Sequence, residues 1–161
     1  MHRHEEGFSL VELLIVVAII LVIAAIAIPS LLRSRIAANQ ASAIESLRVM
    51  GTAEVTYSAI YGNGYSPTLA SLGPVPPGAV ATVSAAGLID DLLANGAKSG
   101  YTFTYTPSLL DFTGRYNGYI ILADPTDVGV TGVDFYYTDE THLIRMNTTA
   151  PAGSTDTLVA Q

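Results

Sequence analysis

A single apolar stretch, residues 8–32, constrains the fold of this chain more than any other feature. It contains one charged side chain, Glu12, in twenty-five positions. About 20 consecutive apolar residues suffice for a helix to cross the ~30 Å hydrocarbon core of a bilayer. The sequence therefore predicts a membrane-spanning helix near its N-terminus.

Two residues distinguish this stretch from a simple anchor. Glu12 lies inside the apolar run, where a charged side chain costs about 2.5–3.5 kcal/mol at the centre of a span and less near the interface. Gly7 precedes the run, whereas a secretory signal peptide is cut after its apolar region. Cleavage after Gly7 would keep the helix and create an α-amine on Phe8, four residues before Glu12. A carboxylate in the first turn of a helix is favoured by the helix dipole and by a nearby ammonium. In a bundle of identical helices, it can pair instead with a neighbour's amine and fix the axial stagger between subunits. The remaining alternative is an unpaired acid near the membrane interface.

The N-terminus resembles that of type IV pilins and the related pseudopilins, through the run GFSLVELLIVVAIILVIAAIAIP. The resemblance is specific over residues 7–35. It implies that a membrane peptidase cuts after Gly7, that Phe8 becomes N-methylated, and that Glu12 guides the addition of subunits to a filament. It also identifies Pro29 as the family's helix-bending proline.

The resemblance also implies partners and a location. The partners are further copies of the chain, a prepilin peptidase that also methylates, the assembly machinery of the inner membrane, and membrane lipid before assembly. The N-terminus would be cytoplasmic, and the subunit would move from the bacterial inner membrane to an extracellular filament. The positive-inside rule alone favours the reverse orientation, because Arg33 and Arg35 follow the span and only Arg3 precedes it.

The apolar periodicity of a helix continues beyond the span to about Tyr61. Pro29 falls in the helix interior, where it removes one backbone hydrogen bond, so we expect a bend or a locally melted segment there. Gly62-Asn63-Gly64 supplies residues that adopt positive φ and should end the helix.

The remaining chain predicts a small head domain. Residues 62–100 read as loop with a short amphipathic helix at 88–94. From 101 to 147 the pattern changes to period two, which predicts four antiparallel strands at 101–106, 118–123, 133–138 and 142–147. Residues 148–161 are small and polar and predict a flexible tail. The expected fold is α+β: a long N-terminal helix packed against a small antiparallel sheet.

This organisation divides the chain into six parts. They are a leader peptide (1–7), the membrane or filament-core half of the helix (8–32), the second half of the helix (33–61), the loop region (62–100), the sheet (101–147) and the tail (148–161).

Composition excludes several classes of function. The formal net charge is −7, which lacks the basic surface expected of a general nucleic-acid-binding protein. Without cysteine there is no disulfide, thiol nucleophile or thiolate metal site. His142 is the only histidine outside the leader and has no recognisable nucleophile beside it in the sequence. We therefore expect neither an enzyme nor a cofactor.

Three acidic residues, Asp124, Asp127 and Asp134, are candidates for a calcium site, although their spacing matches no EF-hand loop. Acidic turns between strands are more commonly solvated.

Taken together, the sequence predicts a pilin, the structural subunit of a type IV pilus that serves adhesion, twitching motility or DNA uptake. Two alternatives stay open: a pseudopilin of a type II secretion system, and a single-span, membrane-anchored binding module.

Overall fold

The computed structural model describes residues 8–159. The chain divides into two compact units, the first ending at Arg35 and the second beginning at Ile36. Helix α1, Leu10–Tyr61, contributes its first half to one unit and its second half to the other. Each unit is described by itself below.

Helix α1 is continuous through Pro29. Proline at this position removes the hydrogen bond that an N–H would donate to the carbonyl of Ala25, yet the flanking turns remain helical. The expectation of a locally melted segment is therefore wrong, because loss of one bond does not break a helix of 52 residues. A bend at Pro29 stays a prediction.

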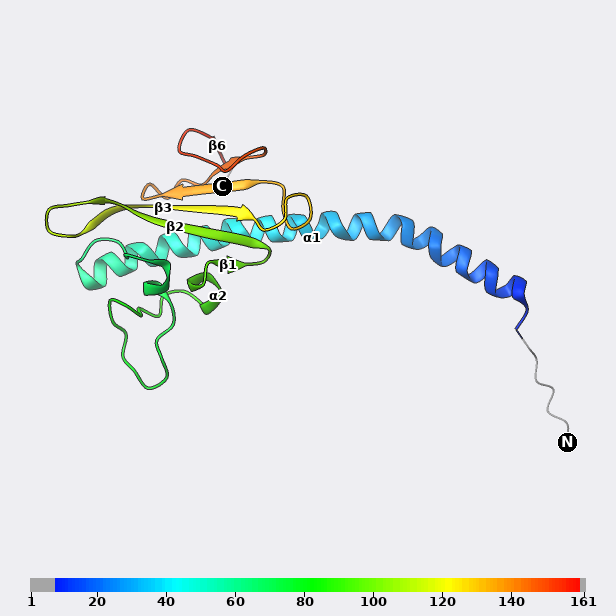
Figure 1. The fold of residues 1–161 in the computed structure, drawn as a ribbon, viewed down its shortest axis with the longest axis horizontal. Helices are drawn as coiled ribbons and strands as arrows, with labels where there is room; N and C mark the ends of the chain where they lie inside the picture. The colour runs from blue at the N-terminus through cyan, green and yellow to red at the C-terminus, as the bar shows by residue number, and fades with distance from the viewer. Residues whose placement is uncertain (1–7, 160–161) are drawn as a thin grey trace. The chain divides into compact units, whose positions relative to one another are not determined.

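The second unit is built on a six-stranded antiparallel sheet in which the strands follow one another in chain order (Figure 1). The sheet confirms the α+β class that the change from period 3.6 to period two predicts. The strands are β1 Ala97–Lys98, β2 Tyr101–Leu110, β3 Tyr116–Pro125, β4 Phe135–Asp139, β5 Arg145–Asn147 and β6 Thr157–Leu158.

Strand β2 shows why this sequence forms a sheet with one buried face. Its aromatic residues Tyr101 and Phe103 are buried, while Thr102 and Thr104 between them are exposed. The register places Phe103 opposite Ala123 of β3, which is also buried, so the two strands present their apolar side chains to the same face.

The sheet is larger than the sequence predicts, and the bounds of all four predicted strands differ. Strands β2 and β3 extend beyond the predicted 101–106 and 118–123, β4 lies one to two residues later than 133–138, and β5 begins three residues later than 142. Strands β1 and β6 are only two residues long, too short for a period to be recognised. Strand β6 lies in the predicted flexible tail, where the N–H of Val159 donates to the carbonyl of Ile144 at 2.9 Å. His142, predicted to begin a strand, lies in the turn before β5 with φ +60°.

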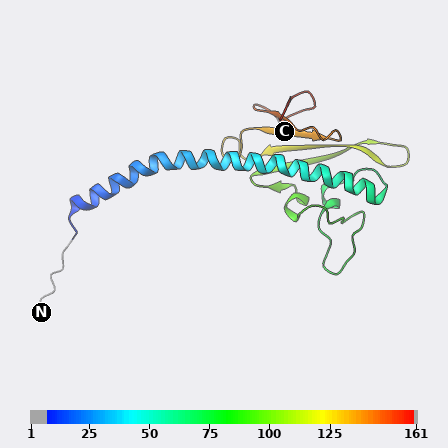
Figure 2. The same ribbon diagram turned by 180° about the vertical axis from the view of Figure 1, so that it is seen from behind.

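The core lies between the buried face of the sheet and the second half of α1, which runs along the sheet (Figure 2). From the helix, the apolar residues Ala43, Leu47, Met50 and Tyr57 are all buried. The spacing of three, four and seven residues keeps them on one side of the helix. Opposite them lie Tyr101, Tyr119, Ile121 and Tyr136 of the sheet.

The segment between α1 and the sheet closes the edge of this core with two short helices. These are η1 (Leu69–Leu72) and α2 (Asp91–Ala94). Helix α2 is shorter than the predicted 88–94 because Asp90 caps it, accepting a hydrogen bond from the N–H of Leu93 at 2.8 Å. Gly64 has φ +76°, and a Cβ there would meet the carbonyl oxygen of Tyr116, so this position requires glycine.

The packing of α1 on the sheet leads to a test. We expect Leu47→Ala to lower the free energy of unfolding by about 2–5 kcal/mol, because Leu47 is buried and its truncation leaves a cavity. The matched control is Val55→Ala on the exposed side of the same helix, which should change it by no more than about 0.5 kcal/mol. Urea unfolding of the full chain in detergent, followed by tyrosine near-ultraviolet circular dichroism, measures both. Equal effects of the two variants would contradict this core.

Candidate assembly site

The candidate site lies at the start of α1, where Ser9 and Glu12 form half of a capping box. Ser9 precedes the first helical residue, and Glu12 is the third residue of the helix. The N–H of Ser9 donates to Oε2 of Glu12 over 3.4 Å. A glutamate at this position reaches back to satisfy an N–H that the helix leaves unpaired, and the helix dipole favours its charge.

This contact adds the N–H of Ser9 as a partner of Glu12 within its own chain, beside the helix dipole and the amine on Phe8 that the sequence predicts. The signal was readable, because serine followed three residues later by glutamate before an apolar run is the pattern of a capping box. Glu12 therefore has two candidate partners: the end of its own helix and, as predicted, an amine on Phe8. Phe8 is exposed, at 81%. Gly7, the predicted cleavage residue, lies outside the described residues.

The apolar side chains that follow Glu12 are exposed in the isolated chain. No residue in the most apolar 18-residue stretch of the helix is buried. By length and composition, α1 is the one helix among residues 8–159 that can cross a membrane. The largest exposed side chains include Leu13, Leu14, Ile19, Ile20, Leu21, Ile23, Ile26 and Ile28. Such a surface requires lipid or other apolar helices as its surroundings.

The three acidic candidates for calcium are placed separately. Asp134 accepts a hydrogen bond from Nε2 of Gln40, and Asp124 lies on β3 with one buried carboxylate oxygen that has no protein partner. Asp127 lies in the loop after β3, where its carbonyl accepts from the N–H of Thr131 at 2.9 Å. Across residues 8–159, no three histidine, cysteine or acidic side chains come together as a metal site.

A buried carboxylate joins α1 to the segment that follows it. Glu54 has no exposed surface, and it accepts hydrogen bonds from the N–H of Ser66 at 2.8 Å and from its hydroxyl at 2.6 Å. The hydroxyl of Tyr105 donates to the carbonyl of Ser66 at 2.7 Å. Glu54 thus anchors the loop after α1 to the helix and, through Ser66, to the sheet.

Burial raises the pKa of the Glu54 carboxyl above its ordinary value of 4.5, and the hydrogen bonds from Ser66 oppose this shift only in part. The same carboxylate contributes to raising the pKa of the Tyr105 hydroxyl, for which burial is the largest cause. No local pattern indicates this anchor, because Glu54 stands in an ordinary helical pattern, and Ser66 and Tyr105 lie 12 and 51 positions later.

Gly51 and His142 form a second contact that the pattern did not reveal. A Cβ at Gly51 would lie 2.8 Å from Nδ1 of His142, so the absence of a side chain lets the imidazole lie against the helix. Nδ1 is 3.5 Å from the hydroxyl of Tyr119. A glycine costs a helix about 1 kcal/mol relative to alanine, and this packing accounts for its presence in mid-helix.

Comparison with known proteins identifies one match. Residues 2–28 match the family model described as the prokaryotic N-terminal methylation motif. Curated proteins and solved structures yielded no match to the chain. The matched residues include Gly7, Phe8 and Glu12, the positions on which the sequence analysis rests.

The raised pKa of Glu54 leads to a prediction of pH-dependent stability. Because the folded-state pKa exceeds the unfolded value, this group stabilises the fold fully below about pH 4.5, and the contribution is lost as the pH rises through the raised pKa. We expect Glu54→Gln, which keeps an oxygen for Ser66, to remove this part of the pH dependence. Wild type should therefore lose stability relative to the variant between about pH 4 and about pH 8.

Urea midpoints of the full chain in detergent at both pH values measure this difference. The control is Glu45→Gln, since Glu45 is exposed on the same helix and its side chain retains 65% of its accessible surface. A difference between wild type and Glu54→Gln that stays constant with pH would contradict the assignment.

Proposed function

We propose that this chain, whose residues 2–28 carry the N-terminal methylation motif of type IV pilins and pseudopilins, is the structural subunit of a type IV pilus. The motif supports the pilin or pseudopilin class, whose members are structural proteins and not enzymes. The proposal rests on one combination: this motif stands at the start of a helix whose apolar surface the single chain leaves unburied.

The proposed assembly exchanges one apolar environment for another. Before assembly, lipid surrounds residues 8–32 with the N-terminus in the cytoplasm. After cleavage between Gly7 and Phe8 and methylation of Phe8, the same surface packs against the helices of other copies in the filament core. The head domains, residues 36–161, then form the outside of the filament. There they would serve adhesion, twitching motility or DNA uptake.

Glu12 is proposed to set the axial position of each incoming subunit. In lipid its carboxylate caps its own helix through Ser9. In the filament it pairs with the amine of Phe8 in a neighbouring subunit, which offsets the cost of placing a charge among apolar helices. The bend proposed at Pro29 would adjust the course of the helix inside the bundle.

A pseudopilin of a type II secretion system is the second candidate, because the same motif occurs in both classes. It would form a short periplasmic filament instead of a surface fibre. A membrane-anchored binding module is the third, and it would retain Met1 and remain monomeric.

The first prediction concerns the N-terminus. Intact mass and N-terminal sequencing of protein sheared from the cell surface should give a chain that begins at a methylated Phe8. The same chain in a filament confined to the periplasm would indicate the pseudopilin. A chain that begins at Met1 and occurs only in membranes would overturn the proposal in favour of the anchored module.

The second prediction separates the two partners of Glu12. Glu12→Ala removes both the cap and the charge, whereas Glu12→Gln retains a side-chain oxygen for the capping box and removes only the charge. We expect both variants to insert into the membrane and both to lose filament yield. Sheared-filament yield and membrane content, measured on the same cells, report the two steps.

The matched control is Glu45→Gln, an exposed glutamate of the same helix in the head domain, which should assemble normally. If Glu12→Gln assembled as well as wild type while Glu12→Ala did not, capping would be the role of Glu12. Wild-type yield from Glu12→Ala would contradict any role of this carboxylate in assembly.

A further inference from the structure

The hairpin between β2 and β3 carries three large apolar side chains into solvent. Phe112 is fully exposed, and Leu109 and Leu110 are exposed by more than 60%. Figure 1 shows this hairpin reaching beyond the rest of the sheet. Single exposed apolar residues are ordinary on a protein surface, but a contiguous group of them commonly marks an interaction site. We call residues 109–112 the apolar tip.

The apolar tip is held in place by its own hydrogen bonds. Oδ1 of Asp111 accepts from the N–H of Thr113 at 2.7 Å, from its hydroxyl at 2.6 Å and from the N–H of Arg115 at 3.0 Å. Leu109 has φ +53°, a conformation that bulky side chains rarely adopt and that is common where function requires it. These bonds hold the turn from which the apolar side chains project, which lowers the entropy cost of binding.

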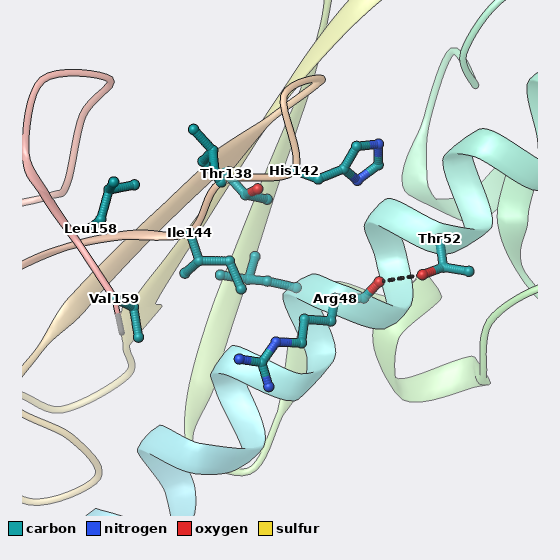
Figure 3. Close-up of a pocket in the computed structure, with 9 residues that line it drawn as sticks. Arg48, Thr52, Thr138, His142, Ile144, Leu158 and Val159 are labelled. Atoms are coloured by element: carbon teal, nitrogen blue, oxygen red, sulfur yellow. Dashed lines mark hydrogen bonds between the residues drawn. The ribbon is translucent and has the colours of Figure 1, made fainter. Parts of the chain in front are cut away.

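Elsewhere in the same unit, a groove of about 740 Å³ lies between α1 and the C-terminal strands (Figure 3). Its walls include Leu143 and Leu158, which are partly exposed, and Ile144, which is nearly buried. Arg48 extends from α1 into the same space, and its carbonyl accepts from the hydroxyl of Thr52 at 2.9 Å. A volume of this size falls within the ~300–1,000 Å³ of pockets that enclose drug-sized ligands, so it can hold more than one side chain.

Tip and groove complement each other in chemistry and in charge. The tip offers Phe112 and Leu110 to a groove lined by Leu143 and Leu158. Between the two apolar side chains of the tip stands Asp111, whose Oδ2 has only a 3.4 Å contact to Asn117 and so retains acceptor capacity. Arg48 in the groove supplies a cation for it, since its contact with Glu45 is long, at 3.5 Å, and exposed.

We propose that the apolar tip of one copy inserts into the groove of a second copy of this chain. Because tip and groove are different surfaces, each copy can engage one neighbour through its tip and another through its groove. A contact of this heterologous kind continues without closing when the rotation between copies does not form a ring. The inference rests on the proposed filament and adds a contact between head domains to the helix bundle at its core.

The absence of cysteine makes a direct test possible, because every thiol in a variant is an introduced one. Filaments are prepared from the full chain carrying Phe112→Cys together with Leu158→Cys, and separately with Leu143→Cys. They are treated with a short bismaleimide and analysed on denaturing gels. We expect a ladder of covalent dimers, trimers and higher multimers, since each copy would be linked to two neighbours.

The matched control combines Phe112→Cys with Val80→Cys, since Val80 is equally accessible, with 81% exposure, but lies outside the groove. It should give monomers. Three results would overturn the inference and leave the proposed function intact. They are filaments that give no ladder with either Leu158→Cys or Leu143→Cys, a ladder in the control, and a crosslink within one chain. Covalent dimers of the single variant Leu158→Cys would show that the grooves of two copies face each other, which would also overturn the inference. If the wild-type chain forms no filament at all, the proposed function fails and this contact fails with it.

A second variant tests the energetic contribution of the tip. Phe112→Ser should leave the thermal midpoint of the detergent-solubilised monomer unchanged, because the side chain of Phe112 is fully exposed and its own chain covers none of it. The same variant should lower the temperature at which filaments dissociate, whereas Val80→Ser should not. Filaments of Phe112→Ser as heat-resistant as wild type would contradict the contact.

Discussion

Everything in this molecule depends on an apolar helix surface that its own chain leaves uncovered. In a soluble domain, the large aliphatic side chains of residues 10–28 would drive aggregation, since each Å² of apolar surface in water costs about 25 cal/mol. They are tolerable only in lipid or against other apolar helices. Residues 2–28 match the prokaryotic N-terminal methylation motif, and the proposed function places this helix in the two environments in turn. The head domain, by contrast, buries its apolar side chains within itself.

One helix meets these two demands through a change of pattern along its length. Around the first half, apolar residues occupy every side, as lipid requires. From Ala43 onward one side packs on the sheet through Leu47, Met50 and Tyr57, while the other sides carry exposed residues such as Glu45, Arg48 and Val55. The buried anchor of Glu54 to Ser66 then ties the chain that leaves the helix to the same core. The proposed packing of helices in the filament core and the folding of the head domain therefore use different parts of α1, so core-helix variants need not disturb the head domain.

The sequence predicts those features that are local. The apolar run, the buried positions Leu47 and Met50, the alternation of Tyr101 to Thr104 and the turn at Gly64 each follow from a period or a backbone requirement. The features it did not predict depend on residues far apart in the chain. Neither the partner of Glu54 nor the imidazole against Gly51 has a local signature, and β6 is too short to show a period. The capping box of Ser9 and Glu12 has a local signature, a serine followed three residues later by a glutamate before an apolar run.

The order of the strands has a consequence for how the head domain forms. Each strand pairs only with the strand before or after it in the chain, so the sheet can grow hairpin by hairpin with short loops to close at each step. Docking on α1 is the step that brings distant residues together. A chain whose helix is already held by the membrane starts with that docking surface in place. Its sheet can then be added strand by strand as the chain emerges, and β6 completes the edge last.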